Sequence, residues 1–149
     1  MDEQRVHGGG PNEDDERESV YGLLQRGQAL IRRRHHAQAA VVLERAARAE
    51  PRKGSILEPL GRAYHHSGQF EQARAVFAEL LEVDPSAPWA HFAISESLRK
   101  LNRIDEARTH ARLAVALSPR SDLYRRALAR LEPPPEGSPG GTEGSSRTD

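Results

Sequence analysis

Two pairs of adjacent histidines are the side chains in this 149-residue sequence that first suggest chemistry. They are His35-His36 and His65-His66, and imidazole both binds metals and titrates near neutral pH. Neighbouring residues of a helix point about 100° apart, so neither pair can chelate one ion alone. No other histidine or acidic residue stands at a spacing that would complete a site. We therefore predict no metal site and no cofactor, and we expect the histidines at helix ends and on a binding surface.

A run of three arginines, Arg32-Arg33-Arg34, directly precedes the first histidine pair. Such a run can contact phosphate groups, and it also suits the negative end of a helix dipole. The folded part offers few aromatic side chains for base stacking, and acidic segments on both sides oppose a polyanion. Nucleic-acid or phosphate binding is therefore the less favoured alternative.

The sequence contains none of the common catalytic motifs. It has no cysteine and no HExxH, the glycines at 8–10 precede no strand–helix unit, and no serine stands in a nucleophile elbow. Because no base, nucleophile and orienting group can be assembled, we predict that the protein is not an enzyme.

Charge divides the neutral chain into three parts. Residues 1–18 carry a net charge of −5, residues 19–131 carry +8, and residues 132–149 carry −3. Both ends are rich in glycine, proline or acidic residues and have too little apolar surface to offset the entropy of ordering. We therefore predict disordered tails at 1–18 and 132–149 around a folded part at 19–131. The basic middle favours acidic partners.

The composition is that of a water-soluble chain, with a mean hydropathy of −0.74 and 30% charged residues. No apolar run approaches the roughly 18 residues of a membrane span. The polar, acidic N-terminus does not resemble a signal peptide. We therefore expect a cytoplasmic protein that does not bind membranes.

Four residue classes recur three times at an interval of 34 residues, which indicates an internal repeat. The recurring positions are a proline (51, 85, 119), an alanine (39, 73, 107), a small residue (27, 61, 95) and a large apolar residue (30, 64, 98).

Each unit is predicted to form two helices. In the second unit, Ile56, Leu57, Leu60 and Tyr64 have helical spacing, and a second apolar stripe runs from Phe70 to Leu81. Gly68 suits the left-handed turn between the two helices, and Asn102 can take the same conformation in the third unit. The small residues allow the two helices of a unit to approach closely, as with Gly61 and Ala73. No alternating apolar run calls for a strand, so we predict an all-α fold.

The pattern resembles the tetratricopeptide repeat family, most closely in the second unit. The matching residues there are Leu57, Leu60, Gly61, Tyr64, Gly68, Phe70, Ala73, Phe77 and Pro85. The outer units depart from the pattern at Arg26, Arg34, His91 and Ala111. The resemblance implies a short right-handed α-solenoid of three helix-turn-helix repeats, at about 20–53, 54–87 and 88–121. The amphipathic segment 122–131 is predicted to be a capping helix, with Ser121 or Asp122 at its start.

In this family the first helices of successive repeats line a concave groove, so the resemblance implies a binding surface there. By their place in the repeats, the residues that we expect to bind a partner are Tyr21, Leu24, Gln28, Ile31, Arg32, Arg62, His65, Trp89, Phe92, Arg99, Lys100 and Arg126. Aromatic and arginine side chains are the residue types that most often dominate binding energy.

We therefore predict a non-catalytic protein–protein interaction module. Its partner would be another protein that presents an extended or helical segment with apolar and acidic residues. The alternative is a structural or regulatory subunit that self-associates weakly. Family members that bind chaperone tails hold a C-terminal carboxylate with Lys, Asn and Arg. The matching positions here are Leu24, Gln28, Pro59, Trp89 and Ala93, which argues against that mechanism.

Overall fold

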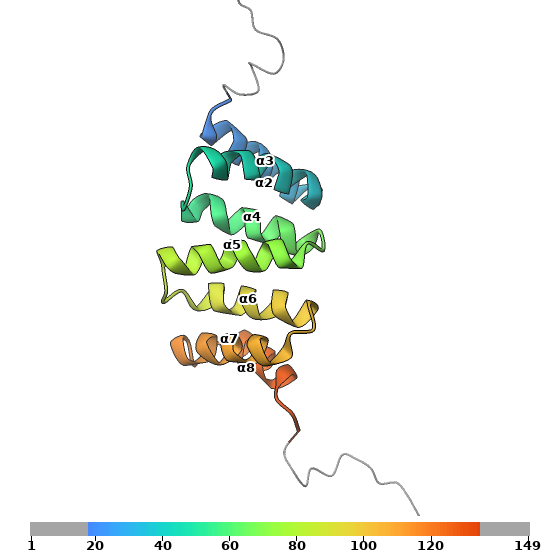
Figure 1. The fold of residues 1–149 in the computed structure, drawn as a ribbon, viewed down its shortest axis with the longest axis vertical. Coiled ribbons are helices and arrows are strands. Elements are labelled where there is room, and N and C mark those ends of the chain that lie inside the picture. Colours follow the sequence, from blue (N-terminus) through green and yellow to red (C-terminus); the bar gives the residue numbers. More distant parts are fainter. Residues whose placement is uncertain (1–17, 135–149) are drawn as a thin grey trace, which may run out of the picture.

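The computed structural model describes residues 18–134, and these residues form seven α-helices. They are α2 (Val20–Arg32), α3 (His36–Ala49), α4 (Gly54–His66), α5 (Phe70–Val83), α6 (Pro88–Lys100), α7 (Ile104–Leu117) and α8 (Asp122–Leu131). Each helix packs against the next, so three hairpins stack in chain order and α8 covers the last one (Figure 1). The all-α fold of three repeats with a capping helix is confirmed. The predicted tails lie outside the described residues, except for Glu18 and the segment 132–134.

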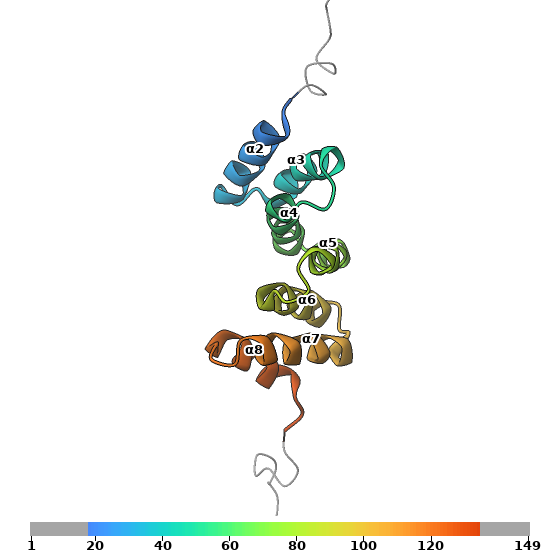
Figure 2. The same ribbon diagram turned by 90° about the vertical axis from the view of Figure 1, so that its left-hand side faces the viewer.

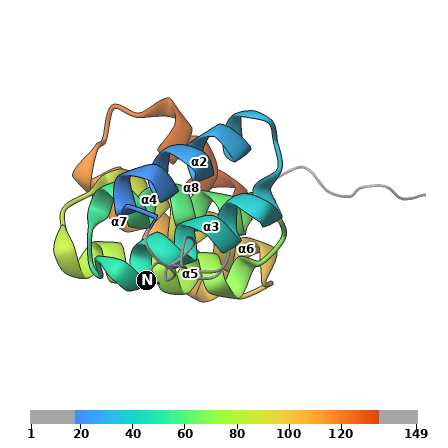
Figure 3. The same ribbon diagram turned by 90° about the horizontal axis from the view of Figure 1, so that it is seen from above.

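The stack has two long faces. Figure 2 shows α2, α4 and α6 along one side and α3, α5 and α7 along the other. Seen from above, the hairpins overlie one another in one column (Figure 3). We call the side of α2, α4 and α6 the first-helix face and the side of α3, α5 and α7 the second-helix face.

The turn inside each hairpin has a residue in the left-handed backbone conformation at the same position. Its φ is 65° at Arg34, 83° at Gly68 and 61° at Asn102. A residue with positive φ ends the first helix and redirects the chain within two residues. The turn geometry is therefore repeated even where arginine has replaced glycine.

Close approach of the two helices in a hairpin depends on a small residue in the first. A Cβ atom at Gly27 would lie 2.5 Å from Leu43, and one at Gly61 would lie 2.6 Å from the ring of Phe77. In the third hairpin Ser95 occupies the corresponding place, and the residue that corresponds to Phe77 is Ala111, which is buried. Serine is larger than glycine, and alanine is smaller than phenylalanine. The two changes therefore compensate, and the two helices still pack closely.

The capping helix is fixed at both ends. The Ser121 hydroxyl accepts a hydrogen bond from the Tyr124 amide at 3.2 Å, which confirms the predicted cap at the start of α8. At the other end, the Arg108 guanidinium donates to the Leu131 carbonyl at 2.8 and 3.1 Å. Arg112 binds the carboxylate of Glu132 at 2.9–3.1 Å. These contacts tie α8 to α7 and cover the last apolar surface of the stack.

Candidate binding surface

Two adjoining hollows lie on the first-helix face. The α2–α4 hollow has a volume of about 520 Å³ and is lined by Gln28, Ile31, Arg32, Ser55, Glu58, Pro59 and Arg62. The α4–α6 hollow has a volume of about 260 Å³ and is lined by Arg62, His65, His66, Phe77, Phe92, Ala93 and Glu96. Because Arg62 borders both, the two hollows form one groove along the stack.

The α4–α6 hollow combines an apolar floor with a charged rim. Phe77 is buried at its base, and the Phe92 ring lies 5.3 Å from the ring of Tyr124 of α8, tilted by 36°. Glu96 on the rim is largely buried and pairs with Arg99 and with Arg130 of α8, each at 3.0 Å. This carboxylate is already neutralised, so it does not repel an incoming acidic group. An apolar side chain of a partner can be buried here beside a cation.

The groove has an excess of positive charge. Arg62 pairs with Glu58 at 3.1 Å, but the pair is more than two-fifths exposed and is worth little by itself. Arg32 is exposed and forms no ion pair within residues 18–134, and Glu96 is shared by two arginines. Coulomb attraction therefore favours a partner segment with carboxylates at its edge.

Two histidines border the α4–α6 hollow. Nδ1 of His65 lies 3.2 Å from the hydroxyl of the buried Ser97, and the His66 ring packs 4.9 Å from that of His36. Burial lowers the pKa of His65 and of His66, and the neighbouring His66 and His36 respectively lower it further. Both rings are therefore held in the neutral form, which suits an apolar pocket wall.

Pro59 leaves one backbone carbonyl of α4 without its helical hydrogen bond. It lies inside α4, where proline has no amide hydrogen to donate to the carbonyl four residues earlier. The Ser55 carbonyl therefore lacks its helical donor, and both residues line the α2–α4 hollow.

The structure brings half of the twelve predicted groove residues into these hollows. They are Gln28, Ile31, Arg32, Arg62, His65 and Phe92. The lining also includes Phe77 and Ala93, which the sequence analysis did not assign to the groove. Phe77 was assigned to the core because its spacing places it inside the hairpin, yet its ring also forms the floor of the hollow.

The other six predicted residues line neither hollow. Leu24 and Trp89 pack partly against the core, and the Trp89 ring meets Phe77 edge-on at 6.0 Å. Tyr21 is 68% exposed, and its hydroxyl accepts a hydrogen bond from Gln25 at 2.8 Å. Arg99 pairs with Glu96, Lys100 lies 5.9 Å from the centre of the Phe70 ring, and Arg126 is exposed on α8.

Within residues 18–134, no group of three or more histidine, aspartate or glutamate side chains is arranged to hold a metal ion. None of the helices in that range has the length and apolar character needed to cross a bilayer.

A stack of helix hairpins with a groove along its first helices defines an α-solenoid repeat protein. A family model described as a tetratricopeptide repeat matches residues 24–88 and 59–122. The chain therefore belongs to the tetratricopeptide repeat family, whose repeats are protein-interaction modules.

Relatives and structural neighbours agree with this family. The chain is 29% identical over 97 residues to mouse Superkiller complex protein 3 and 30% identical over 87 residues to the human protein. These matches cover 65% and 58% of this chain, and only 6% of each relative.

Among solved structures, MamA from Desulfovibrio magneticus has a TM-score of 0.74 at 18% identity, covering 78% of this chain and 66% of that one. The Arabidopsis OM64 TPR domain has a TM-score of 0.71 at 19% identity, covering 78% and 96%. The first TPR of Spaghetti (RPAP3), bound to the HSP90 peptide SRMEEVD, has a TM-score of 0.70 at 15% identity, covering 75% and 89%. At these identities the likeness shows the fold.

Proposed function

We propose that this chain binds a segment of a partner protein in the groove of the first-helix face, and that the segment carries apolar and acidic residues. The α4–α6 hollow is the observation that carries the proposal. Its phenylalanine floor can bury an apolar side chain, and Arg62 stands where an acidic neighbour of that side chain would lie. The location expected for this activity is the cytoplasm.

The partner segment is expected to be internal rather than a C-terminal tail. The RPAP3 domain binds a peptide that ends in EEVD. In this chain, Leu24, Pro59 and Trp89 are three of the residues at the positions that hold a tail carboxylate in chaperone-binding members of the family. None of these side chains carries a positive charge, so none can form a charge-assisted hydrogen bond to a carboxylate.

A peptide selection tests the proposal. A random peptide library displayed on phage is selected against the chain, and enriched peptides are measured by fluorescence anisotropy. We expect enrichment of peptides with one large apolar residue and nearby carboxylates, and at least tenfold weaker binding to Arg62→Glu. The matched control is Arg48→Glu on α3, whose exposed side chain lies outside both hollows. Peptides that bind both variants equally would contradict the groove.

Self-association is the second candidate, and one observation favours it. Two apolar side chains of the first hairpin, Tyr21 and Val41, are 68% and 62% exposed. Sedimentation velocity across a hundredfold range of concentration tests it. A concentration-dependent shift that Val41→Ser abolishes would support self-association.

A further inference from the structure

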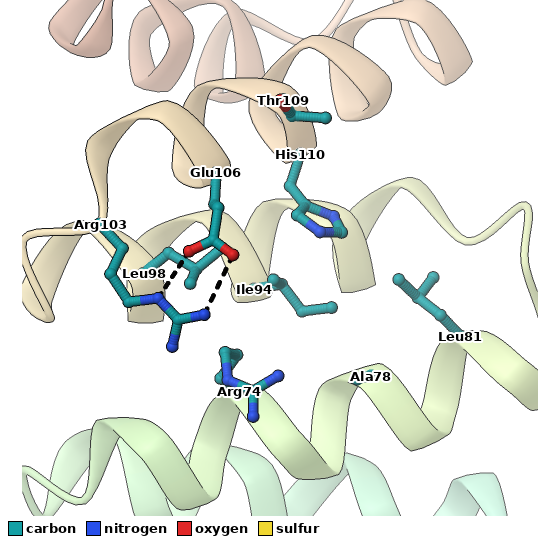
Figure 4. Close-up of a pocket in the computed structure, with 9 residues that line it drawn as sticks. All are labelled: Arg74, Ala78, Leu81, Ile94, Leu98, Arg103, Glu106, Thr109 and His110. Atoms are coloured by element: carbon teal, nitrogen blue, oxygen red, sulfur yellow. Dashed lines mark hydrogen bonds and ion pairs between the residues drawn. The ribbon is translucent and has the colours of Figure 1, made fainter.

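A third hollow lies on the second-helix face, away from the groove. It has a volume of about 260 Å³ and opens between α5 and α7 (Figure 4). Its floor is formed by Ile94 and Leu98 of α6, and Ala78 and Leu81 form the wall on α5. The ring of His110 points into it from α7 (Figure 4). We call it the α5–α7 hollow.

The repeat register explains why the α5–α7 hollow exists. One repeat earlier, the place of Leu98 is taken by Tyr64 and the place of Ala78 by Glu44. Tyr64 is buried, and its hydroxyl donates a hydrogen bond to the Glu44 carboxylate. A phenol ring therefore fills the space between α3 and α5. Between α5 and α7, leucine at 98 and alanine at 78 supply neither the ring nor its acceptor, and the space is open.

His110 supplies an acceptor in place of the missing carboxylate. Nε2 of His91 lies 3.2 Å from the Pro85 carbonyl, so this nitrogen carries the hydrogen and Nδ1 of His91 is an acceptor. Nδ1 of His110 lies 3.2 Å from it and, with both rings neutral, is the donor of this pair. Nε2 of His110 is then unprotonated, and within residues 18–134 it has no hydrogen-bond partner. It can accept a hydrogen bond from a hydroxyl group.

The charge around the α5–α7 hollow favours a neutral occupant. Arg103 binds Glu106 at 2.6 and 3.0 Å and Glu71 at 3.2 Å, and Arg74 also pairs with Glu71. Two arginines and two glutamates thus cancel at the rim. An apolar cavity of about 150 Å³ already holds benzene, so this larger hollow has room for a ring with a hydroxyl group.

We propose that the α5–α7 hollow is a second docking site, which receives a tyrosine side chain from a partner protein. The ring packs on Leu98 and Ala78, and the phenol hydroxyl donates to Nε2 of His110. The internal pair of Tyr64 and Glu44 shows the same chemistry one repeat earlier. The site is independent of the groove on the first-helix face.

The test uses p-cresol, which has the ring and hydroxyl of a tyrosine side chain. It is titrated into ¹⁵N-labelled chain, with toluene as the probe that lacks the hydroxyl. We expect saturable shifts at the amides of Ala78, Leu98 and His110, with a Kd on the order of millimolar. Toluene is expected to bind at least fivefold more weakly. Shifts scattered over other surfaces, or equal affinity for toluene, would overturn the proposal.

Two variants that fill the hollow from different walls make the test specific. Leu98→Tyr and Ala78→Leu are each expected to weaken p-cresol binding at least tenfold while circular dichroism still shows the parent helix content. Leu30→Tyr makes the same change at the corresponding place of the first hairpin and should bind p-cresol as the parent does. Unchanged binding in both filling variants would overturn the site.

A peptide selection identifies the occupant and distinguishes the α5–α7 hollow from the groove. Peptides are selected on Arg62→Glu, in which the groove is altered, and we expect them to contain tyrosine and to be displaced by p-cresol. Selection of peptides without tyrosine would overturn the choice of occupant. Shifts at the hollow that grow with protein concentration and vanish in Tyr21→Ala would instead place a second copy there, and would overturn a foreign partner. None of these outcomes depends on whether the groove binds its own segment.

Discussion

Arg34 holds a backbone conformation that a side chain with a Cβ atom avoids. Its φ is 65°, and Gly68 has a φ of 83° at the same place in the next hairpin. The left-handed conformation costs a non-glycine residue about 1–2 kcal/mol. Arg34 is exposed at the end of the α2–α3 hairpin, so few contacts offset this cost.

Arg34→Gly is therefore expected to stabilise the fold. Greater freedom of glycine in the unfolded chain offsets roughly 0.5–1 kcal/mol of the relief, which leaves a net gain of about 0.5–1 kcal/mol. We expect the melting temperature to rise by about 2–6 °C, measured by circular dichroism. Arg33→Gly is the matched control, because φ at Arg33 is −86° and glycine gains nothing there. A similar rise in both variants would show that loss of charge, not backbone strain, is responsible.

Three histidines link stability to pH. Burial is the main cause that lowers the pKa of His65, His66 and His110, and neighbouring histidines add to it. When the folded-state pKa of a histidine is below its unfolded value, the unfolded chain binds more protons between the two values. Stability then rises with pH across that window and is lost as the pH falls below the ordinary value of about 6.5.

We expect urea unfolding to show lower stability at pH 5.5 than at pH 7.5. His110→Gln and His65→Gln should each reduce this difference, because the titrating group is removed. His35→Gln is the control at an exposed position and should keep the difference. A chain that is equally stable at both pH values would show that folding does not lower the pKa of these rings.

The helices could be predicted from the sequence because the same residue classes recur in register. The interval of 34 residues fixed the hairpins, and Gly68 with Asn102 marked their turns. The groove could be predicted only in part: a register assigns Trp89 to the first-helix face, but not that its ring turns toward Phe77. The α5–α7 hollow was missed, although Leu98 and Ala78 signal it when they are compared with Tyr64 and Glu44. The hollow arises from two replacements on different helices, and neither replacement alone indicates a cavity.

The third hairpin differs from the first two by a paired exchange. Glycine faces a large side chain in the first two hairpins, as with Gly61 and Phe77. Ser95 takes the place of the glycine in the third, its hydroxyl donates to the Ala107 carbonyl at 2.8 Å, and Ala111 takes the place of the large side chain. The two positions are expected to be energetically coupled.

A double-mutant cycle tests this coupling. Ala111→Leu alone should destabilise by roughly 1–3 kcal/mol because leucine meets the Ser95 side chain. Ser95→Gly alone should cost about 1–2 kcal/mol through the lost hydrogen bond and lower helix propensity. The double variant recreates the Gly27–Leu43 pair, so we expect a favourable coupling of about 1 kcal/mol in urea unfolding. The same cycle with Ser97→Gly is the control and should be additive. Additive behaviour at Ser95 as well would show that these side chains do not meet.

At the scale of the whole molecule, the acidic N-terminal segment and the basic groove have opposite charge. Residues 13–16 are Glu-Asp-Asp-Glu and lie outside the described residues. The one described acid of this segment, Glu18, pairs with Arg26 at 2.8 Å and with Arg45 at 3.9 Å. Glu18 therefore ties the start of α2 to α3 and does not enter the groove. Two roles remain for residues 13–16: support of the first hairpin, or competition with acidic ligands in the groove.

Deletion of residues 1–16 distinguishes these roles. A tethered acidic segment would meet Arg32 and Arg62 at an effective concentration on the order of millimolar. We expect the deletion to tighten binding of a selected acidic peptide about two- to fivefold at low salt, and the gain to fade as salt screens exposed charges. Replacing Glu13, Asp14, Asp15 and Glu16 by their amides keeps the length and should reproduce the gain, since the competition is electrostatic. Anisotropy titrations at two salt concentrations measure the effect.

If the deletion instead leaves affinity unchanged at low salt and lowers the melting temperature, the acids support the first hairpin through its helix dipole, and competition is ruled out.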